Sequence, residues 1–414
     1  MLCQAQARAR SSFLLVARES WIIILPMARI LWIIPVAVLL AQEPRPVGKT
    51  KEDQARNAIL LGGYDYSKYG PAITGYAGQD RQQIAALHWM PATRTRIGEI
   101  GNYRAGLTRL ANGKLVAAVC RERPGHSDFD VLVYASEDDG LSWTRIDKTP
   151  LCGKEPSLTT LPDGSIVLTV QGGRVGCGPR GVEGANPIWR SRDGGVRWER
   201  HELRGDDYPR NLIVEKNGGL LMVRAYQRPG SGAEETGPDF ELCRSQDGAV
   251  TWSCKAAKVP WDSTHGEVSA IRLRNGKLLA ATRRSVPGTR DGHGFGEMML
   301  TESSDDGRTW AKPWSMSHTG EVHAYLTELR DGRLLSSYTS YHVPFGTAAV
   351  LSRDGGKTWD LEHPVQLAFS AEAQGGWPVT IEARDGGLLT ILALTNYAKQ
   401  PLKFTCEIVH WRIP

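Results

Sequence analysis

The chain has 414 residues, with 50 Lys and Arg against 45 Asp and Glu, which gives a formal net charge of +5. Residues 1–41 carry +3 of this charge, so the remaining chain carries only +2. This balance excludes the strongly basic surface that nucleic-acid or membrane-surface binding would need. The 45 Gly and 13 Trp residues favour many short strands joined by turns.

The N-terminal segment has the layout of a secretory signal peptide. A basic start at 27–29 precedes an apolar run from Ile30 to Ala41 that ends in a small residue. This run has 12 residues and is interrupted by Pro35, whereas a membrane helix needs roughly 20 apolar residues. We therefore expect residues 1–41 to be a cleaved signal peptide, with Met27 as an alternative start of translation. The protein is then secreted or periplasmic, with no stable membrane span.

A hairpin unit occurs six times in the rest of the chain. Residues 42–80, rich in Gly and Tyr, are expected to form a linker or a cap, and residues 81–414 the folded domain. Each unit has an apolar strand, a turn with Gly and a second apolar strand. The units are 104–118, 155–169, 210–223, 267–281, 323–337 and 377–391. Six such repeats predict an all-β fold, a six-bladed β-propeller.

Five of the units are followed by an eight-residue repeated turn, Ser-x-Asp-x-Gly-x-x-Trp, in which Ala249 replaces Gly once. The copies are 136–143, 191–198, 245–252, 303–310 and 352–359. Ser and Asp can bond nearby backbone, Gly permits positive φ, and Trp packs under the hairpin, so we interpret this turn as structural. The sixth unit runs into the C-terminus instead. We expect Ile84–Thr93 to supply the missing fourth strand and so to close the ring.

Export makes disulfides possible, and one cysteine pair brackets a repeated turn. Cys243 and Cys254 flank the third copy. If that copy is the turn of a hairpin, the two residues face each other across the strands and can form a bridge. Cys120 and Cys406 have apolar neighbours and are interpreted as buried thiols.

The first strand of each unit begins with a polar or aromatic residue, nine positions before the turn Gly. These residues are Arg104, Glu155, Pro209 (beside Arg210), Glu267, His323 and Trp377. The first strand of a propeller blade lines the central channel. Buried charge needs a partner, so a charge at one register in several apolar strands is not explained by core packing. The pattern predicts a polar ring around a central pocket.

The repeated turns and an Arg opening the first unit resemble the sialidase (neuraminidase) superfamily, whose turns are called Asp boxes (BNR repeats), over residues 81–414. The resemblance implies a secreted glycoside hydrolase of the exo-α-sialidase type that cleaves a terminal acidic sugar from a glycan. It implies that Arg104 belongs to an arginine triad gripping the substrate carboxylate. It also pairs Glu267 with Arg283, sixteen residues later.

The resemblance implies further catalytic and binding residues. The family's acid/base aspartate precedes the first repeated turn, where Asp128 fits and Asp130 competes. An arginine just ahead of it matches Arg123 or Arg121. Glu267 would be the partner base. The residues expected to bind the substrate are Arg104, Arg123, Glu155, Arg210, Arg283, His323 and Trp377.

Two positions depart from the family pattern. The family nucleophile is a tyrosine opening the sixth blade, where this chain has Trp377 and then Pro. The triad's third Arg is missing from late in the fifth blade, which offers Tyr341 among its polar residues. Either Tyr341 or Tyr397 approaches Glu267 as the nucleophile, or Asp128 and Glu267 act as an ordinary carboxylate pair.

Two other functions stay open. One is a polysaccharide lyase acting on uronic acids, in which His323 or Tyr341 abstracts the α proton. The other is a non-catalytic carbohydrate-binding propeller, with Trp377 as a platform for the sugar. No HExxH or CxxC spacing calls for a metal, and no cofactor is expected. We expect a monomer whose partner is a glycan or glycoconjugate and not a nucleic acid.

Overall fold

The computed structural model describes eleven stretches of the chain, all of them in the unit Pro44–Pro414. They are residues 72–74, 88–122, 129–171, 185–205, 210–227, 236–260, 265–285, 296–342, 344–372, 376–395 and 404–414. Every regular element in them is a β-strand. Within these stretches, no helix has the length and apolar character to cross a membrane.

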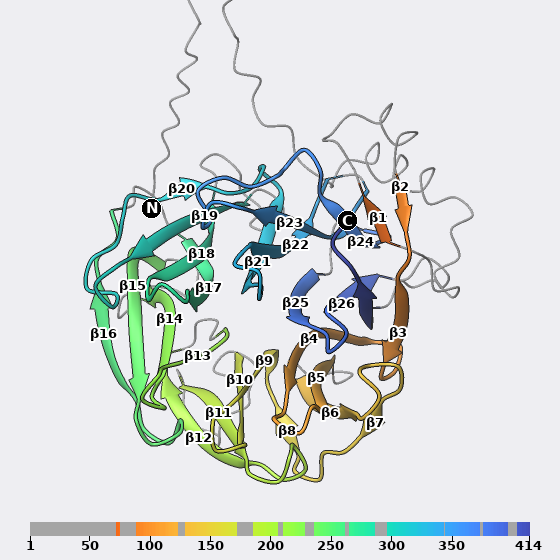
Figure 1. The fold of residues 1–414 in the computed structure, drawn as a ribbon. Coiled ribbons are helices and arrows are strands. Elements are labelled where there is room, and N and C mark those ends of the chain that lie inside the picture. Colours follow the sequence, from red (N-terminus) through yellow and green to blue (C-terminus); the bar gives the residue numbers. More distant parts are fainter. Residues whose placement is uncertain are drawn as a thin grey trace, which may run out of the picture. The chain divides into compact units, whose positions relative to one another are not determined.

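Six antiparallel sheets stand around a common centre, and the first strand of each sheet lies nearest that centre (Figure 1). Sheet one has β4 (Asn102–Arg109), β5 (Leu115–Glu122), β6 (Phe129–Ser136) and β7 (Thr144–Arg145), with β8 (Leu151–Cys152) also on β6. Sheet two has β9 (Lys154–Thr160), β10 (Ile166–Gln171), β11 (Ala185–Ser191) and β12 (Glu199–Arg204). Sheet three has β13 (Ile213–Val214), β14 (Leu220–Gln227), β15 (Thr236–Ser245) and β16 (Ser253–Ala257).

Sheets four to six complete the propeller. Sheet four has β17 (His265–Arg272), β18 (Leu278–Ser285), β19 (Gly296–Ser303) and β20 (Trp314–Ser315). Sheet five has β21 (Glu321–Glu328), β22 (Leu334–Ser340), β23 (Gly346–Ser352) and β24 (Val365–Phe369), extended by β1 (Ala72–Thr74) and β2 (His88–Met90). Sheet six has β25 (Gly376–Glu382), β26 (Leu388–Thr395), β27 (Phe404–Trp411) and β3 (Thr93–Ile97). The predicted six-bladed all-β propeller is confirmed.

An N-terminal strand closes the sixth sheet, but it is not the segment predicted. β3 pairs with β27, from Thr93 opposite His410 to Ile97 opposite Cys406. The predicted segment 84–93 contributes only Thr93 to this pairing, and its residues 88–90 pair with β1 on sheet five. Pro91 lies between β2 and β3 and has no N–H for a strand ladder, which explains why the extended run breaks there.

The second strand of each blade supplies most of the core. In β26, each of the eight residues is at most 3% exposed. Each such strand belongs to a sheet that packs between two neighbouring sheets. Both of its faces are therefore covered, which explains why its sequence is mostly apolar. One cluster of buried side chains, for example, joins Leu107 and Leu115 of sheet one to Leu389 and Ile391 of sheet six. Apolar packing between blades therefore holds the ring together.

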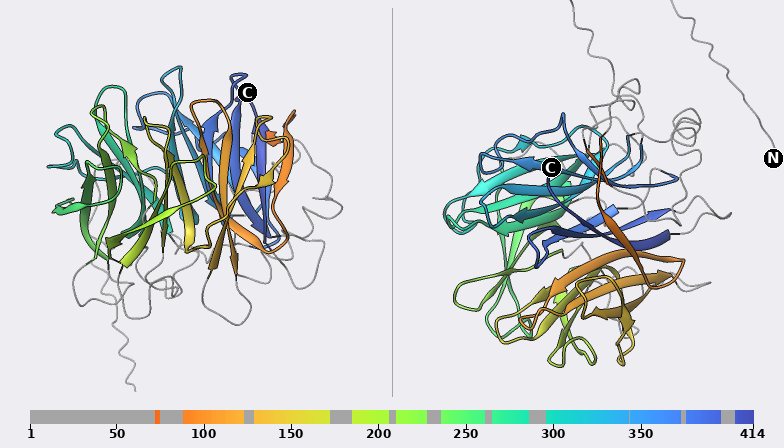
Figure 2. Two further views of the ribbon diagram at one scale, coloured as in Figure 1. Left: turned by 90° about the horizontal axis from the view of Figure 1, so that it is seen from below. Right: turned by 45° about the vertical axis from the view of Figure 1, so that its right-hand side comes forward.

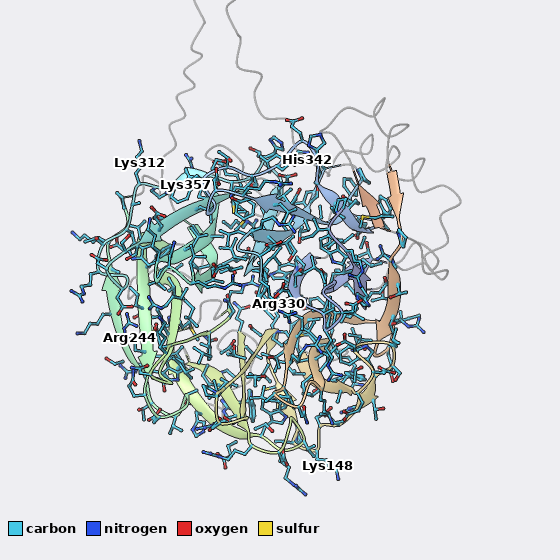
Figure 3. All side chains as sticks on the ribbon, viewed as in Figure 1. Lys148, Arg244, Lys312, Arg330, His342 and Lys357 are labelled. Atoms are coloured by element: carbon cyan, nitrogen blue, oxygen red, sulfur yellow. A yellow bond between two sulfur atoms is a disulfide. The ribbon has the colours of Figure 1, made fainter. Side chains whose placement is uncertain are left out.

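The strands run along the axis of the ring, so their turns lie at its two ends (left panel of Figure 2). The hairpins between first and second strands point to one end, where Arg330 lies near the centre of the view (Figure 3). Arg330 bonds Glu382 of the next blade through its backbone N–H (3.1 Å) and its side chain (3.3 Å). The first strands begin at the opposite end, and the predicted site lies there.

The repeated turn is held as the sequence predicts. In the first copy, the Gly140 N–H donates to Ser136 Oγ (2.8 Å), the Ser142 N–H to the Asp138 carboxylate (2.9 Å) and Trp143 Nε1 to the Gly140 carbonyl (3.1 Å). Hydrogen bonds to Ser142 hold the pKa of Asp138 at about 2. The turn is thus a structural device of the outer strands.

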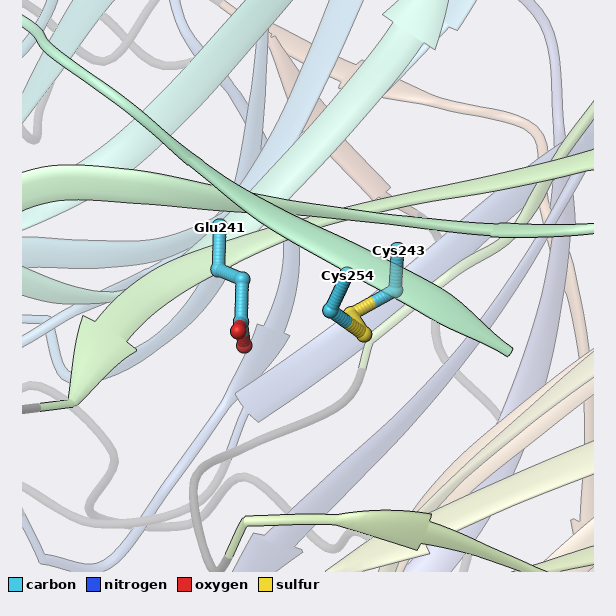
Figure 4. Close-up of side chains that lie close together, drawn as sticks. All are labelled: Glu241, Cys243 and Cys254. Atoms are coloured by element: carbon cyan, nitrogen blue, oxygen red, sulfur yellow. A yellow bond between two sulfur atoms is a disulfide. The ribbon is translucent and has the colours of Figure 1, made fainter. Parts of the chain in front are cut away.

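Cys243 and Cys254 form the predicted disulfide (Figure 4). They are directly paired residues of β15 and β16, with their Cα atoms 4.0 Å apart. Cys120 and Cys406 are fully buried, as predicted.

Candidate active site

The inner strands present their first residues through a shared backbone irregularity. Arg104, Glu155, Glu267, His323 and Trp377 all have left-handed backbones, with φ between 48° and 60°. The pairing register between first and second strands shifts at each of these positions. A β-bulge of this kind redirects a side chain. Because each left-handed non-glycine residue costs on the order of 1–3 kcal/mol, five of them around one axis mark this end of the channel as a candidate functional site.

Neighbouring blades meet through a chain of polar contacts between these residues and Arg210. Arg104 pairs with Glu155, and Glu155 Oε2 lies 3.0 Å from Nη2 of Arg210. The same guanidinium lies 3.8 Å from Glu267 Oε1, and Glu267 Oε2 lies 3.2 Å from His323 Nε2. The chain of contacts therefore runs through blades one to five in order.

Trp377 of blade six completes the circuit. Its indole stacks on the His323 ring, with the centroids 3.9 Å apart and the planes at 22°. The Arg104 guanidinium carbon lies 3.6 Å from the Trp377 ring centre, within range of a cation–π interaction. We call these six residues the axial ring: Arg104, Glu155, Arg210, Glu267, His323 and Trp377. In blade three the residue at the equivalent position is Pro209, which lies outside the described residues. The contacts of this blade are made by the next residue, Arg210.

Glu267 is the most heavily contacted carboxylate of the axial ring. Besides Arg210 and His323, it receives the Arg283 guanidinium of β18 at 3.3 Å, which confirms the predicted proximity of the two. Burial alone would raise the pKa of Glu267, but attraction to His323, Arg283 and Arg210 outweighs burial and holds the pKa well below its usual range. Burial lowers the pKa of His323 to about 4, despite the opposing effect of Glu267. At neutral pH the pair is therefore a carboxylate beside a neutral imidazole.

A small cavity lies inside the axial ring. It is lined by the ring residues and by the inner-strand residues that follow them, including Asn211, Ser269 and Tyr325. The free space is about 30 Å³, which holds about one or two water molecules and no sugar ring. Among the described residues, four buried polar atoms around it have neither a hydrogen-bond nor an ion-pair partner: Arg104 Nε, Asn211 Oδ1, Ser269 Oγ and Trp377 Nε1. This site has unmet hydrogen-bonding capacity, as expected where a ligand or ordered water binds.

A sugar would have to bind on the outer side of the axial ring. The arginines are the ring's most accessible charges, because the side chains of Arg104 and Arg210 are 14% and 16% exposed. Those of Glu155 and His323 are 2% and 1% exposed. A ligand approaching along the axis therefore meets guanidinium groups before it meets the more deeply buried carboxylate of Glu155.

Two tyrosines lie at the site. Tyr341, the predicted substitute nucleophile, meets the His323 ring edge-to-face with centroids 6.1 Å apart. Burial raises the pKa of Tyr341 to about 12, and the same cause raises that of Tyr325 to about 12. Tyr325 was missed by the sequence analysis. It lines the cavity two residues after His323 on β21, and the alternation of side chains along a strand could have indicated it.

Three of the predicted site residues, Arg123, Asp128 and Tyr397, lie outside the described residues. Their alternatives Asp130 and Arg121 are described: they form an ion pair of 3.0 Å between the facing strands β6 and β5.

No known family model matches this sequence, and no curated protein matches it significantly. Solved structures do resemble it. A protein of unknown function from Dyadobacter fermentans is 18% identical, with a TM-score of 0.57 over 77% of this chain and 96% of its own. An α-L-arabinanase of Penicillium chrysogenum, solved with arabinobiose, is 15% identical, with a TM-score of 0.55 over 82% and 98%. The NanB sialidase of Streptococcus pneumoniae is 12% identical, with a TM-score of 0.54 over 81% and 72%. At these identities, the comparisons establish a shared propeller fold.

Proposed function

We propose that this protein is a glycoside hydrolase that removes a terminal sugar from a glycan at the outer side of the axial ring. One observation carries the proposal: Glu267 is a buried, ionised carboxylate held on the propeller axis by Arg210, Arg283 and His323. A pre-positioned carboxylate is the group on which most glycoside hydrolases rely. The arabinanase and sialidase of the same fold support this chemistry.

The charge of the site supports an acidic sugar, as in sialidases. Three guanidinium groups, those of Arg104, Arg210 and Arg283, face only two carboxylates, those of Glu155 and Glu267. With a neutral His323, one positive charge is left to attract a sugar carboxylate. Arginine suits this role because its planar fork binds carboxylates in a bidentate manner.

The contacts of Glu267 favour this carboxylate, rather than a tyrosine, as the group that attacks the sugar or activates water. Trp377 occupies the place of the family's tyrosine, and the raised pKa of Tyr341 opposes phenolate formation. Glu155 and Glu267 each contact two guanidinium groups, which suits a base or nucleophile and not a group that must hold a proton. We therefore assign the acid to Asp128, the residue that the resemblance to sialidases implies.

The lyase alternative has less support. A base that abstracts the α proton needs a free lone pair. Nδ1 of His323 bonds Thr339 Oγ1 at 3.2 Å, and Nε2 faces the Glu267 carboxylate at 3.2 Å, so neither ring nitrogen points freely into the site. Export by the N-terminal segment 1–41 is part of the proposal, because an extracellular enzyme would meet such glycans.

The test is a panel of chromogenic glycosides that includes a sialoside and several uronides. We expect Glu267→Gln to lower kcat on the cleaved substrate by on the order of 10² to 10⁴, because the neutral amide can neither attack nor accept a proton. NMR of the product would report retention or inversion at the anomeric carbon.

Glu321→Gln is the matched control. Glu321 is also buried, but it bonds Tyr338 and the His318 backbone instead of the axial ring, so turnover should stay near wild type. A Glu267→Gln protein keeping more than half of the wild-type kcat would remove Glu267 from the mechanism. Sugar binding without cleavage of any glycoside would favour a carbohydrate-binding protein, and unsaturated products a lyase.

A further inference from the structure

A chain of three side chains extends from Glu267 into the fifth blade. Thr339 Oγ1 lies 3.2 Å from His323 Nδ1, and His323 Nε2 lies 3.2 Å from Glu267 Oε2. Thr339 is fully buried on β22, beside the bulge that carries His323. A Cβ atom added at Gly376 would overlap the Thr339 hydroxyl, so the backbone of blade six packs directly against that hydroxyl.

Hydrogen-bonding rules fix the direction of this chain. An ionised carboxylate only accepts hydrogen bonds, so Nε2 of His323 must carry the hydrogen that points to Glu267. A neutral imidazole then has its acceptor at Nδ1, which requires the Thr339 hydroxyl to donate. With Glu267 ionised and His323 neutral, the Thr339 O–H donates to His323 Nδ1, and the Nε2–H faces Glu267 Oε2 at 3.2 Å.

We propose that His323, oriented by Thr339, is a positioning residue that holds Oε2 of Glu267 and leaves Oε1 for the reaction. Two contacts fix Oε2, from His323 at 3.2 Å and Arg283 at 3.3 Å. Oε1 has the longer contact, 3.8 Å to Arg210. A carboxylate held by one oxygen presents the other in a defined direction, as catalysis requires. This role rests on the proposed function, since it assumes that Glu267 reacts.

The groups that face the imidazole are compatible with this role. Glu267 faces it from β17, Arg283 from β18 and Arg210 from the start of blade three. The indole of Trp377 stacks on it and the phenol ring of Tyr341 meets its edge. Burial and the two arginines favour the neutral imidazole, and only Glu267 opposes them.

The kinetic test is Thr339→Val, which removes the hydroxyl with little change in volume. We expect kcat to fall by on the order of 10-fold with KM unchanged, because the residue acts through orientation and not through substrate contact. Thr339→Ser should restore turnover. Thr301→Val is the matched control, since Thr301 is equally buried but bonds the Ala311 carbonyl on the outer part of blade four. Equal kcat values for the two valine variants would overturn the proposal.

A second test does not depend on activity. Nitrogen-15 NMR of the histidine rings, assigned with a His323→Asn variant, should show His323 neutral and protonated on Nε2 at pH 7, and should show this state disturbed in Thr339→Val. A charged His323 or an Nδ1–H tautomer in the wild type would refute the hydrogen-bonded chain. If the NMR agrees but no glycoside is cleaved, the proposed function fails and the catalytic role of His323 fails with it. If cleavage occurs and Thr339→Val leaves it intact, only the positioning role is lost.

Discussion

Five residues of the axial ring are held in a left-handed backbone conformation, although their side chains favour a negative φ. Arg104, Glu155, Glu267, His323 and Trp377 have side chains that disfavour a positive φ. Each is kept there by contacts with the next blade, since every ring side chain touches its neighbours. The backbone strain at each position is therefore offset by the closed circuit of contacts.

His323 should make the stability of the protein depend on pH. Its pKa is about 4 in the folded protein, against about 6.5 in an unfolded chain. Between these values the unfolded state binds a proton that the folded state does not. The contribution of His323 to the free energy of unfolding is therefore fully present above about pH 6.5 and is lost as the pH drops toward 4. A shift of this size corresponds to roughly 3 kcal/mol. We expect Tm to fall more between pH 7 and 4.5 for the wild type than for His323→Asn, measured by calorimetry; equal losses would contradict this.

The repeated turn connects the outer strands of five blades, and its last copy differs from the others in the hydrogen bond of its tryptophan. In the copies at 143, 198, 252 and 310, the Trp Nε1 donates to the carbonyl four residues after the Ser. In the last copy, Trp314 of the neighbouring blade bonds the Gly356 carbonyl at 2.9 Å instead. Trp359 Nε1 is then buried without a partner. The last turn thus exchanges an internal bond for one between blades.

This exchange predicts different costs for the same substitution in two copies. Trp143 and Trp359 are both partly buried, so changing either to Phe removes a similar volume. Trp143→Phe also breaks a hydrogen bond of 3.1 Å, whereas Trp359→Phe removes an unpaired N–H. We expect Trp143→Phe to be more destabilising by about 1 kcal/mol, measured by urea unfolding. The reverse order would mean that Trp359 has a partner in solution.

For the molecule as a whole, stability depends on joining β3 and β27, two strands far apart in sequence, in sheet six. Arg94 of β3 lies buried 3.7 Å from Glu407 of β27 and donates to the Leu367 carbonyl of blade five. Burial raises the pKa of Glu407, and Arg94 opposes this effect. One guanidinium therefore links β3, β27 and the preceding blade.

Arg94→Met should weaken this closure, because it leaves a carboxyl group buried without its charge partner. The expected loss is about 3–5 kcal/mol in chemical denaturation. Adding Glu407→Gln should recover part of it. Thr93→Ala, at an exposed position of the same strand, should change stability by less than about 0.5 kcal/mol. If Arg94→Met costs no more than Thr93→Ala, the ion pair does not secure the ring.

Much of the architecture could be predicted from the sequence. Six hairpin units with Gly at a fixed place define six blades, since turn residues and alternation are local properties of the chain. Counting nine residues back from the turn Gly of each unit predicted that Arg104, Glu155, Glu267, His323 and Trp377 share one register. The pair Cys243 and Cys254 followed from its position around a single turn. Each of these inferences needs only residues near one another in sequence.

What only the tertiary structure decided is how distant residues meet. The closing strand is 93–97 and not 84–93, because its pairing depends on the edge of β27, which lies more than 300 residues later in the chain. No local sequence pattern predicts a left-handed Glu or Trp, because these residues adopt that backbone conformation only when contacts with neighbouring blades stabilise it. The pairing of Glu267 with His323 and Thr339 likewise joins two blades. Such contacts depend on how the blades close into a ring, and the ring forms only when all six pack together.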